Sequence, residues 1–339
     1  MTIIKILLYI SLAISLLSSS SIKMIEPKLA IKMVKQKNIK FISAEEESVG
    51  IINSVVIPIH LLYNVDVLGN HTCSPLYACS SRMEKIIKKL NITKDNQLII
   101  YDKTYGIYAS TLYTTLESMG YTNISLLNGG YSSIAQLDPN QKAYDEYVAE
   151  ENEVRELLRK ENSKDLILRY HSLLKTLKKK ILVLKPLLLV QPIAQQNYPF
   201  FKDKVEKQSI DLTHLSTKLE LKLAIKKIEE KGIDSNITLI DACNMVNILE
   251  KNSSNGSEMI DSLSWKDIID KKREGIKAEK FLKKMFLELG LKKENLFYIY
   301  CMSESEKAFY MQVALRIAEY NKIKVFSGNW DTWIGAKIE

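Results

Sequence analysis

Glycine, proline and histidine are scarce in this sequence. Only 12 glycines and 7 prolines occur among 339 residues, which excludes a collagen-like or a wholly disordered chain. The 4 histidines show none of the spacings of a zinc site, so we expect no metal centre. The net charge of +8 comes from scattered lysines. Because no basic cluster is interleaved with aromatic residues, we expect no nucleic-acid partner.

Long hydrophobic runs are also missing. The first 21 residues, "MTIIKILLYISLAISLLSSSS", have an early lysine, an apolar stretch from Ile6 to Leu17 and then small residues. This layout is typical of a signal peptide, and the stretch is shorter than the ~20 residues that span a bilayer. We expect residues 1–21 to be cleaved, leaving a periplasmic or secreted protein without a stable membrane span. An N-terminal membrane anchor is the second choice.

Cysteine occurs at 4 positions, namely Cys73, Cys79, Cys243 and Cys301. In an exported protein they would meet an environment in which disulfides persist. Cys73 and Cys79 lie on either side of Pro75, an arrangement that would allow a loop disulfide.

An internal repeat organises the chain. At an offset of 199, "KLNITKDNQLIIYDK" (89–103) lies over "ELGLKKENLFYIYCM" (288–302), and this gapless match continues to about residue 134. At an offset of 198, "NIKFISA" (38–44) matches "NITLIDA" (236–242). A repeat of this length indicates two copies of one domain, which we place at residues 24–139 and 213–339.

Each copy alternates between two kinds of periodicity. The runs "LIIY" and "FYIY" are continuous and apolar, as in buried parallel strands. Helical spacing follows, and then a second strand with a turn. This order predicts an α/β fold with helices on both faces of a mainly parallel sheet. Reactive groups gather at the carboxyl ends of such strands, where Asp102 and Cys301 stand.

Residues 140–212 interrupt the repeat with long charged helical segments. The apolar run "ILVLKPLLLV" (181–190) contains Lys185 and Pro186 and is too short to cross a membrane. We interpret the region as a helical insert that joins the domains. A helix that binds a protein partner or a membrane surface is the alternative.

The order strand, cysteine, loop and helix, followed by a strand and Gly-x-Trp, resembles the tandem rhodanese family of sulfurtransferases, of exported bacterial type. "LLNGGY" (126–131), "FSGNWDTW" (326–333) and "LIDAC" (239–243) are similar to its motifs. The resemblance implies two rhodanese-like domains, the first inactive because Asp102 replaces the active cysteine. It also implies that a Cys301 persulfide carries sulfur from thiosulfate or 3-mercaptopyruvate to a thiol or cyanide, without a cofactor.

The proposed active-site loop departs from the family pattern, which usually contains glycine and ends in arginine or threonine. It consists of Met302, Ser303, Glu304, Ser305 and Glu306. A carboxylate about 4 Å from a persulfide anion costs on the order of 1 to 4 kcal/mol. Ser303 and Glu306 also fit a capping box, in which the helix end would satisfy its own amides.

Two alternatives follow from these departures. One is a catalytically inactive rhodanese-like module used for binding or structure. The other is a two-cysteine redox module, because Cys243 takes the place of the family's arginine in D-x-R. If the family's sheet order holds, Cys243 and Cys301 end neighbouring strands about 4.8 Å apart. A buried, inert Cys243 is the simpler interpretation. We expect Trp265, Trp330 and Trp333 to pack in the core.

Overall fold

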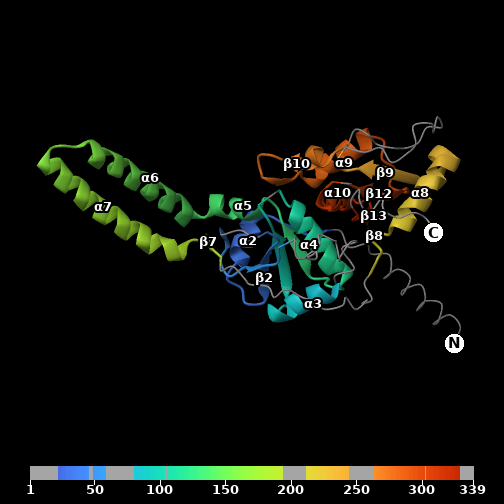
Figure 1. The fold of residues 1–339 in the computed structure, drawn as a ribbon, viewed down its shortest axis with the longest axis horizontal. Coiled ribbons are helices and arrows are strands. Elements are labelled where there is room, and N and C mark those ends of the chain that lie inside the picture. The colour runs from blue at the N-terminus through green and yellow to red at the C-terminus, as the bar shows by residue number, and fades with distance from the viewer. Residues whose placement is uncertain are drawn as a thin grey trace, which may run out of the picture. The chain divides into compact units, whose positions relative to one another are not determined.

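The computed structural model describes residues 22–45, 49–58, 80–103, 105–193, 211–243, 263–301 and 303–328. They form two compact units, which we describe separately (Figure 1). The N-terminal unit consists of Met24–Thr213 with the short segment Ile269–Ile276, and the C-terminal unit of His214–Ile268 and Lys277–Glu339, with which the described residues 22 and 23 are grouped. The proposed signal peptide, Cys73, Cys79, Met302, Trp330 and Trp333 lie outside the described residues.

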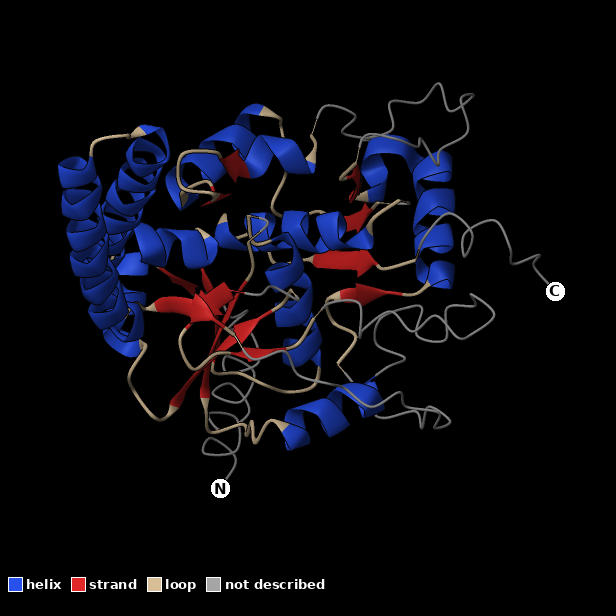
Figure 2. Ribbon diagram, turned by 60° about the vertical axis from the view of Figure 1, so that its left-hand side comes forward, coloured by secondary structure: helices blue, strands red, loops and turns tan. Residues whose placement is uncertain are grey.

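The N-terminal unit is built on a five-stranded parallel sheet with the order β1-β6-β5-β2-β4. Its strands are β1 (Met24–Ile25), β2 (Ile39–Ser43), β4 (Val55–Val56), β5 (Gln97–Tyr101) and β6 (Ile124–Leu127). Helices flank it (Figure 2), namely α2 (Pro27–Met33), α3 (Ser80–Lys89), α4 (Ile107–Ser118) and α5 (Gly130–Leu137). In β5, Ile99 and Tyr101 pack with α2 and α5, while Leu98 and Ile100, on the opposite face, are buried as well. A strand buried on both faces explains its unbroken apolar run.

The C-terminal unit contains a four-stranded parallel sheet with the order β8-β13-β12-β9. Its elements are β8 (Leu215–Ser216), α8 (Lys218–Lys231), η4 (Gly232–Ser235), β9 (Ile237–Asp241), η5 (Trp265–Ile268), α9 (Glu279–Glu288), β12 (Leu296–Tyr300), α10 (Ser305–Ile317) and β13 (Ile323–Phe326). Tyr320 packs edge-on against Phe286 and Phe297, with ring centroids 5.8 and 5.4 Å away. Such aromatic pairs stabilise a core beyond the area they bury.

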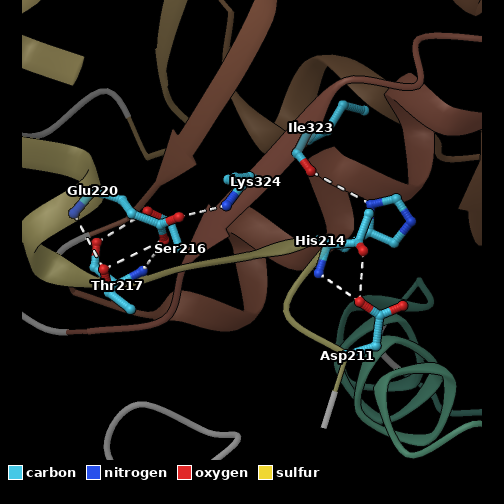
Figure 3. A network of polar contacts seen from close by, with 8 residues as sticks. Asp211, His214, Ser216, Thr217, Glu220, Ile323 and Lys324 are labelled. Carbon is cyan, nitrogen blue, oxygen red and sulfur yellow. Dashed lines mark hydrogen bonds and ion pairs between the residues drawn. The ribbon is translucent and has the colours of Figure 1, made fainter. Parts of the chain in front are cut away.

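A capping box begins α8 (Figure 3). The Thr217 hydroxyl accepts from the Glu220 amide at 3.1 Å, and the Glu220 carboxylate accepts from the Thr217 amide at 2.9 Å. The same carboxylate binds Lys324 of β13 at 2.6 Å. Although partial burial works to raise the pKa of Glu220, the hydrogen bonds from Lys324 and Thr217 lower it below its ordinary value. The start of this helix is therefore joined to the sheet beside it.

The register of the strands confirms the internal repeat. In the N-terminal sheet Ser43 lies opposite Tyr101, and in the C-terminal sheet Asp241 lies opposite Tyr300. These pairs are the ones that the sequence offsets of 198 and 199 equate. The expected α/β architecture, with one mainly parallel sheet in each copy, is thus confirmed.

Two long helices follow the first copy. They are α6 (Pro139–Lys160) and α7 (Lys164–Leu184), which pack on each other through Val154, Leu174 and Leu177. Asp138 joins the two ends of the hairpin, since its carboxylate accepts from Asn140 at 3.0 Å and from Leu189 at 2.8 Å. Leu189 precedes β7 (Val190–Pro192), which pairs antiparallel with β3 (Val49–Ile51). In the part of the chain that is described, no helix has both the length and the apolar character for a membrane span.

Candidate active site

Two cysteines follow neighbouring strands of the C-terminal sheet. Cys301 comes directly after Tyr300, the last residue of β12, and Cys243 follows β9 by two residues. Parallel pairing places Asp241 opposite Tyr300, so the two chains leave the sheet side by side. The structure joins Cys243 and Cys301 by a disulfide, with their Cα atoms 5.4 Å apart.

A tight turn directs Cys243 toward Cys301. The amide of Cys243 donates to the buried Asp241 carboxylate at 2.9 Å, and the amide of Ala242 donates to the Tyr300 carbonyl at 2.9 Å. An aspartate that accepts from the amide two residues later forms a local turn of its own. The aspartate of "LIDAC" therefore shapes the turn that presents the second sulfur.

Polar groups surround the sulfur of Cys301. The amide of Glu304 donates to it at 3.2 Å, and the Ser303 hydroxyl lies 3.3 Å from it and 3.8 Å from the Cys243 sulfur. Cys301 itself is 0% exposed, whereas Cys243 is half-buried and Ser303 and Glu304 are exposed. The Cys301 sulfur thus lies beneath an exposed loop and accepts at least one hydrogen bond from backbone.

The expectation of a capping box at Ser303 and Glu306 was wrong. Helix α10 begins at Ser305, and its N-cap residue is Glu304, whose side chain makes no capping hydrogen bond. The Ser303 hydroxyl contacts the two sulfur atoms instead. A capping box is formed elsewhere, between Thr217, the N-cap residue of α8, and Glu220 in the first turn of that helix.

A lysine offsets part of the negative charge in the loop. Lys307, in the first turn of α10, binds the Glu304 carboxylate at 2.7 Å. Its ammonium also lies over the ring of Trp265, 4.8 Å from the centroid, an arrangement that is favourable for a cation. The cost expected for Glu304 beside a persulfide anion is reduced by this ion pair.

Trp265 is not a core residue, contrary to expectation. It is half-buried, and its amide donates to the carbonyl of Ala242 at 2.9 Å, next to Cys243. Lys307 and Trp265 are the neighbours of the site that sequence reasoning missed. The spacing of Glu304 and Lys307 as an i,i+3 pair was the available signal.

The N-terminal copy holds an anion at the position equivalent to Cys301. Asp102 follows β5 and is 1% exposed, and its carboxylate oxygens accept from the amides of Gly106 at 2.7 Å and Ala109 at 2.8 Å, at the start of α4. Gly130 lies against the Asp102 carbonyl so closely that a Cβ atom there would come within 2.1 Å of it. This strand-to-helix junction therefore binds a negative charge with backbone N–H groups.

The position equivalent to Cys243 is Glu45, and it also reaches the neighbouring loop. The Glu45 carboxylate accepts from the amide of Lys103, directly after Asp102, at 2.6 Å. The Ser43 hydroxyl lies 3.1 Å from the Glu45 carbonyl, close to the same turn. Both copies thus link the turn after the second strand to the loop after the central strand.

Comparison with known proteins agrees with this geometry. Residues 31–137 match the family model described as rhodanese-like domain. The N-terminal copy is a rhodanese-like domain. No curated protein sequence matches the chain significantly.

Solved structures of rhodanese fold resemble both copies together. The 3-mercaptopyruvate sulfotransferase SseA from Escherichia coli superposes with a TM-score of 0.58 at 14% identity, over 91% of this chain and 99% of its own. Tum1 from Saccharomyces cerevisiae superposes with a TM-score of 0.56 at 15% identity, over 92% of this chain and 95% of its own. The sulfur transferase subunit of yeast mitochondrial complex I superposes with a TM-score of 0.58 at 16% identity, over 94% of this chain and 97% of its own. The chain therefore has the tandem rhodanese fold.

The rhodanese-like domain matched by the family model carries Asp102, while the second copy carries Cys301. Among the described residues, no group of three or more histidine, cysteine, aspartate or glutamate side chains is placed to hold a metal ion.

Proposed function

We propose that the protein is a sulfurtransferase that moves a sulfane sulfur from thiosulfate or 3-mercaptopyruvate to a thiol or cyanide through a persulfide on Cys301. One observation carries the proposal. Cys301 stands at the strand-to-helix junction where the other copy binds a carboxylate, and the Glu304 amide donates to its sulfur. An N–H group directed at a cysteine favours the thiolate, which is the reactive form.

The reaction has two steps. The Cys301 thiolate attacks the outer sulfur of thiosulfate, the sulfur–sulfur bond of the donor breaks, and sulfite leaves with the bonding electron pair. The acceptor then attacks the outer sulfur of the persulfide and restores the thiolate. Such covalent catalysis divides one difficult transfer into two easier ones.

The disulfide imposes a condition on this chemistry. While Cys301 is bonded to Cys243, it has no thiolate to offer, so activity requires prior reduction. Because Cys301 is buried beneath the exposed loop residues Ser303 and Glu304, while Cys243 is half-buried, we expect the donor to enter from the side of Cys243. Export remains part of the proposal, and a disulfide suits an oxidising compartment.

The test is persulfide formation on a variant that cannot form the disulfide. We expect reduced Cys243→Ser protein, freed of reductant and incubated with thiosulfate or 3-mercaptopyruvate, to gain ~32 Da by intact mass spectrometry, the mass of one sulfur in a covalent intermediate. Cys301→Ser is the matched control and should gain nothing. If folded Cys243→Ser protein keeps its mass with either donor, the sulfurtransferase assignment is wrong.

A further inference from the structure

We infer that Cys243 is a resolving thiol: it attacks the Cys301 persulfide, releases sulfide, and leaves the Cys243–Cys301 disulfide. The protein would then reduce sulfane sulfur to sulfide at the expense of a dithiol, an activity beyond simple sulfur transfer. This inference rests on the persulfide chemistry proposed above.

The backbone places the two sulfur atoms for this reaction. The Cα separation of 5.4 Å lies within the usual range for a disulfide. Two further contacts hold the two strand ends together, the pairing of Asp241 with Tyr300 and the bond from Ala242 to Tyr300, while the bond from Cys243 to Asp241 fixes the turn on one side. None of them involves a sulfur atom, so they do not depend on the disulfide.

The other copy supports this view of the frame. There the linkage runs from Glu45 to the amide of Lys103 at 2.6 Å, with no sulfur present. The approach of the two loops is therefore a property of the fold. In the second copy, the groups brought together at this place are the sulfur atoms of Cys243 and Cys301.

The resolving step balances without an external oxidant. The Cys243 thiolate donates its electron pair to the inner sulfur, Sγ of Cys301. The bond from that atom to the outer sulfur breaks, and the outer sulfur leaves as hydrosulfide. The outer sulfur is reduced and the two cysteines are oxidised. For thiosulfate, the products are sulfite, sulfide and the protein disulfide.

The difference in burial between the two sulfur atoms determines which of them a reductant attacks when the disulfide is reduced. A dithiol reductant reaches the half-buried Cys243 more readily than Cys301, which is 0% exposed. Attack on the Cys243 sulfur expels Cys301 as a thiolate, the better leaving group because the Glu304 amide stabilises its charge. Reduction from this side therefore regenerates the attacking group for the next donor.

A single turnover without added thiol tests the inference. Chains carrying Cys73→Ser and Cys79→Ser contain only the two thiols of the site. We expect this reduced protein, given 3-mercaptopyruvate or thiosulfate, to release about one sulfide per chain and to lose ~2 Da as the disulfide forms. With Cys243→Ser added, we expect the persulfide to remain and the rate of sulfide release to fall at least tenfold.

The outcomes separate the two proposals. If Cys243→Ser protein forms the persulfide and releases sulfide at the parent rate, Cys243 is not the resolving thiol and only sulfur transfer stands. The same holds if the parent protein keeps the added sulfur without forming the disulfide. If neither protein reacts with either donor, the proposed function itself fails. A second measurement needs no variant at Cys243. In the parent protein, the sulfide released and the 243–301 disulfide detected by peptide mapping should appear in equal amounts. Sulfide without the disulfide would refute the inference.

Discussion

Reduction of the Cys243–Cys301 disulfide should destabilise the C-terminal unit by a calculable amount. The bond joins residues with a sequence separation of 58. Closing a loop of this size removes about 14 cal/mol/K of conformational entropy from the unfolded chain, or about 4 kcal/mol at 25 °C. The reduced protein should therefore be the less stable form.

Tryptophan fluorescence during urea unfolding is a suitable assay. All 3 tryptophans, Trp265, Trp330 and Trp333, lie in the second half of the sequence, so the signal reports on the C-terminal unit. With an m value of about 2 kcal/mol/M, a loss of 4 kcal/mol lowers the urea midpoint by about 2 M. The protein should carry Cys73→Ser and Cys79→Ser so that reductant acts on one bond.

Cys243→Ser in the same background is the matched control. Its midpoint should not respond to reductant and should lie within about 0.5 M of that of the reduced parent, a typical effect of one substitution. The reasoning is refuted if reductant moves the parent midpoint by less than about 0.5 M, far below the loop-entropy value. An equal shift in Cys243→Ser protein would refute it as well.

Two further predictions concern the N-terminal unit. Burial raises the pKa of Tyr101 to about 12. Between pH 10 and 12 the folded state therefore keeps a proton that the unfolded state has lost. The free energy of unfolding should fall by up to about 2.7 kcal/mol over this range. Tyr101→Phe should remove that dependence in circular-dichroism melts while costing about 1 kcal/mol at pH 7, through lost hydrogen bonds to Ile51 and Ser54; an unchanged alkaline slope would contradict this. Asp102→Asn removes the charge that accepts from Gly106 and Ala109 and should cost about 2 kcal/mol. Hydrogen exchange should speed up at the start of α4, and unaltered protection there would refute the anion role.

Much of the fold could be predicted because the sequence repeat shows two copies of one domain, and each copy contains the same order of apolar strand and amphipathic helix. The runs around Tyr101 and Tyr300 had to be buried on both faces, which made them central parallel strands. Once their neighbours were placed by the offset of 198, the family sheet order brought Cys243 beside Cys301. That juxtaposition depends on long-range pairing, which sequence spacing alone does not contain.

The interactions that could not be predicted from the sequence are those in which one polar group could bind either a local or a distant partner. Ser303 fits a capping box as well as Thr217 does, but its hydroxyl contacts sulfur and the helix begins two residues later. A local motif cannot reveal a partner that is distant in sequence. The same applies to Asn128, whose side chain accepts from the amide of Ile276 at 3.2 Å and so helps to hold Ile269–Ile276 in the N-terminal unit.

The two copies differ in which groups meet on a shared frame. In the first copy the buried Asp102 carboxylate accepts hydrogen bonds from the amides of Gly106 and Ala109. A substrate anion would have to displace a buried carboxylate from two charge-assisted hydrogen bonds, each worth about 1.5 to 3 kcal/mol. In the second copy the equivalent residue is a thiol, whose charge appears only on reduction. Since a sulfur carrier needs a nucleophile that can form and break a sulfur–sulfur bond, we expect the chemistry at Cys301 and a structural role for the first copy.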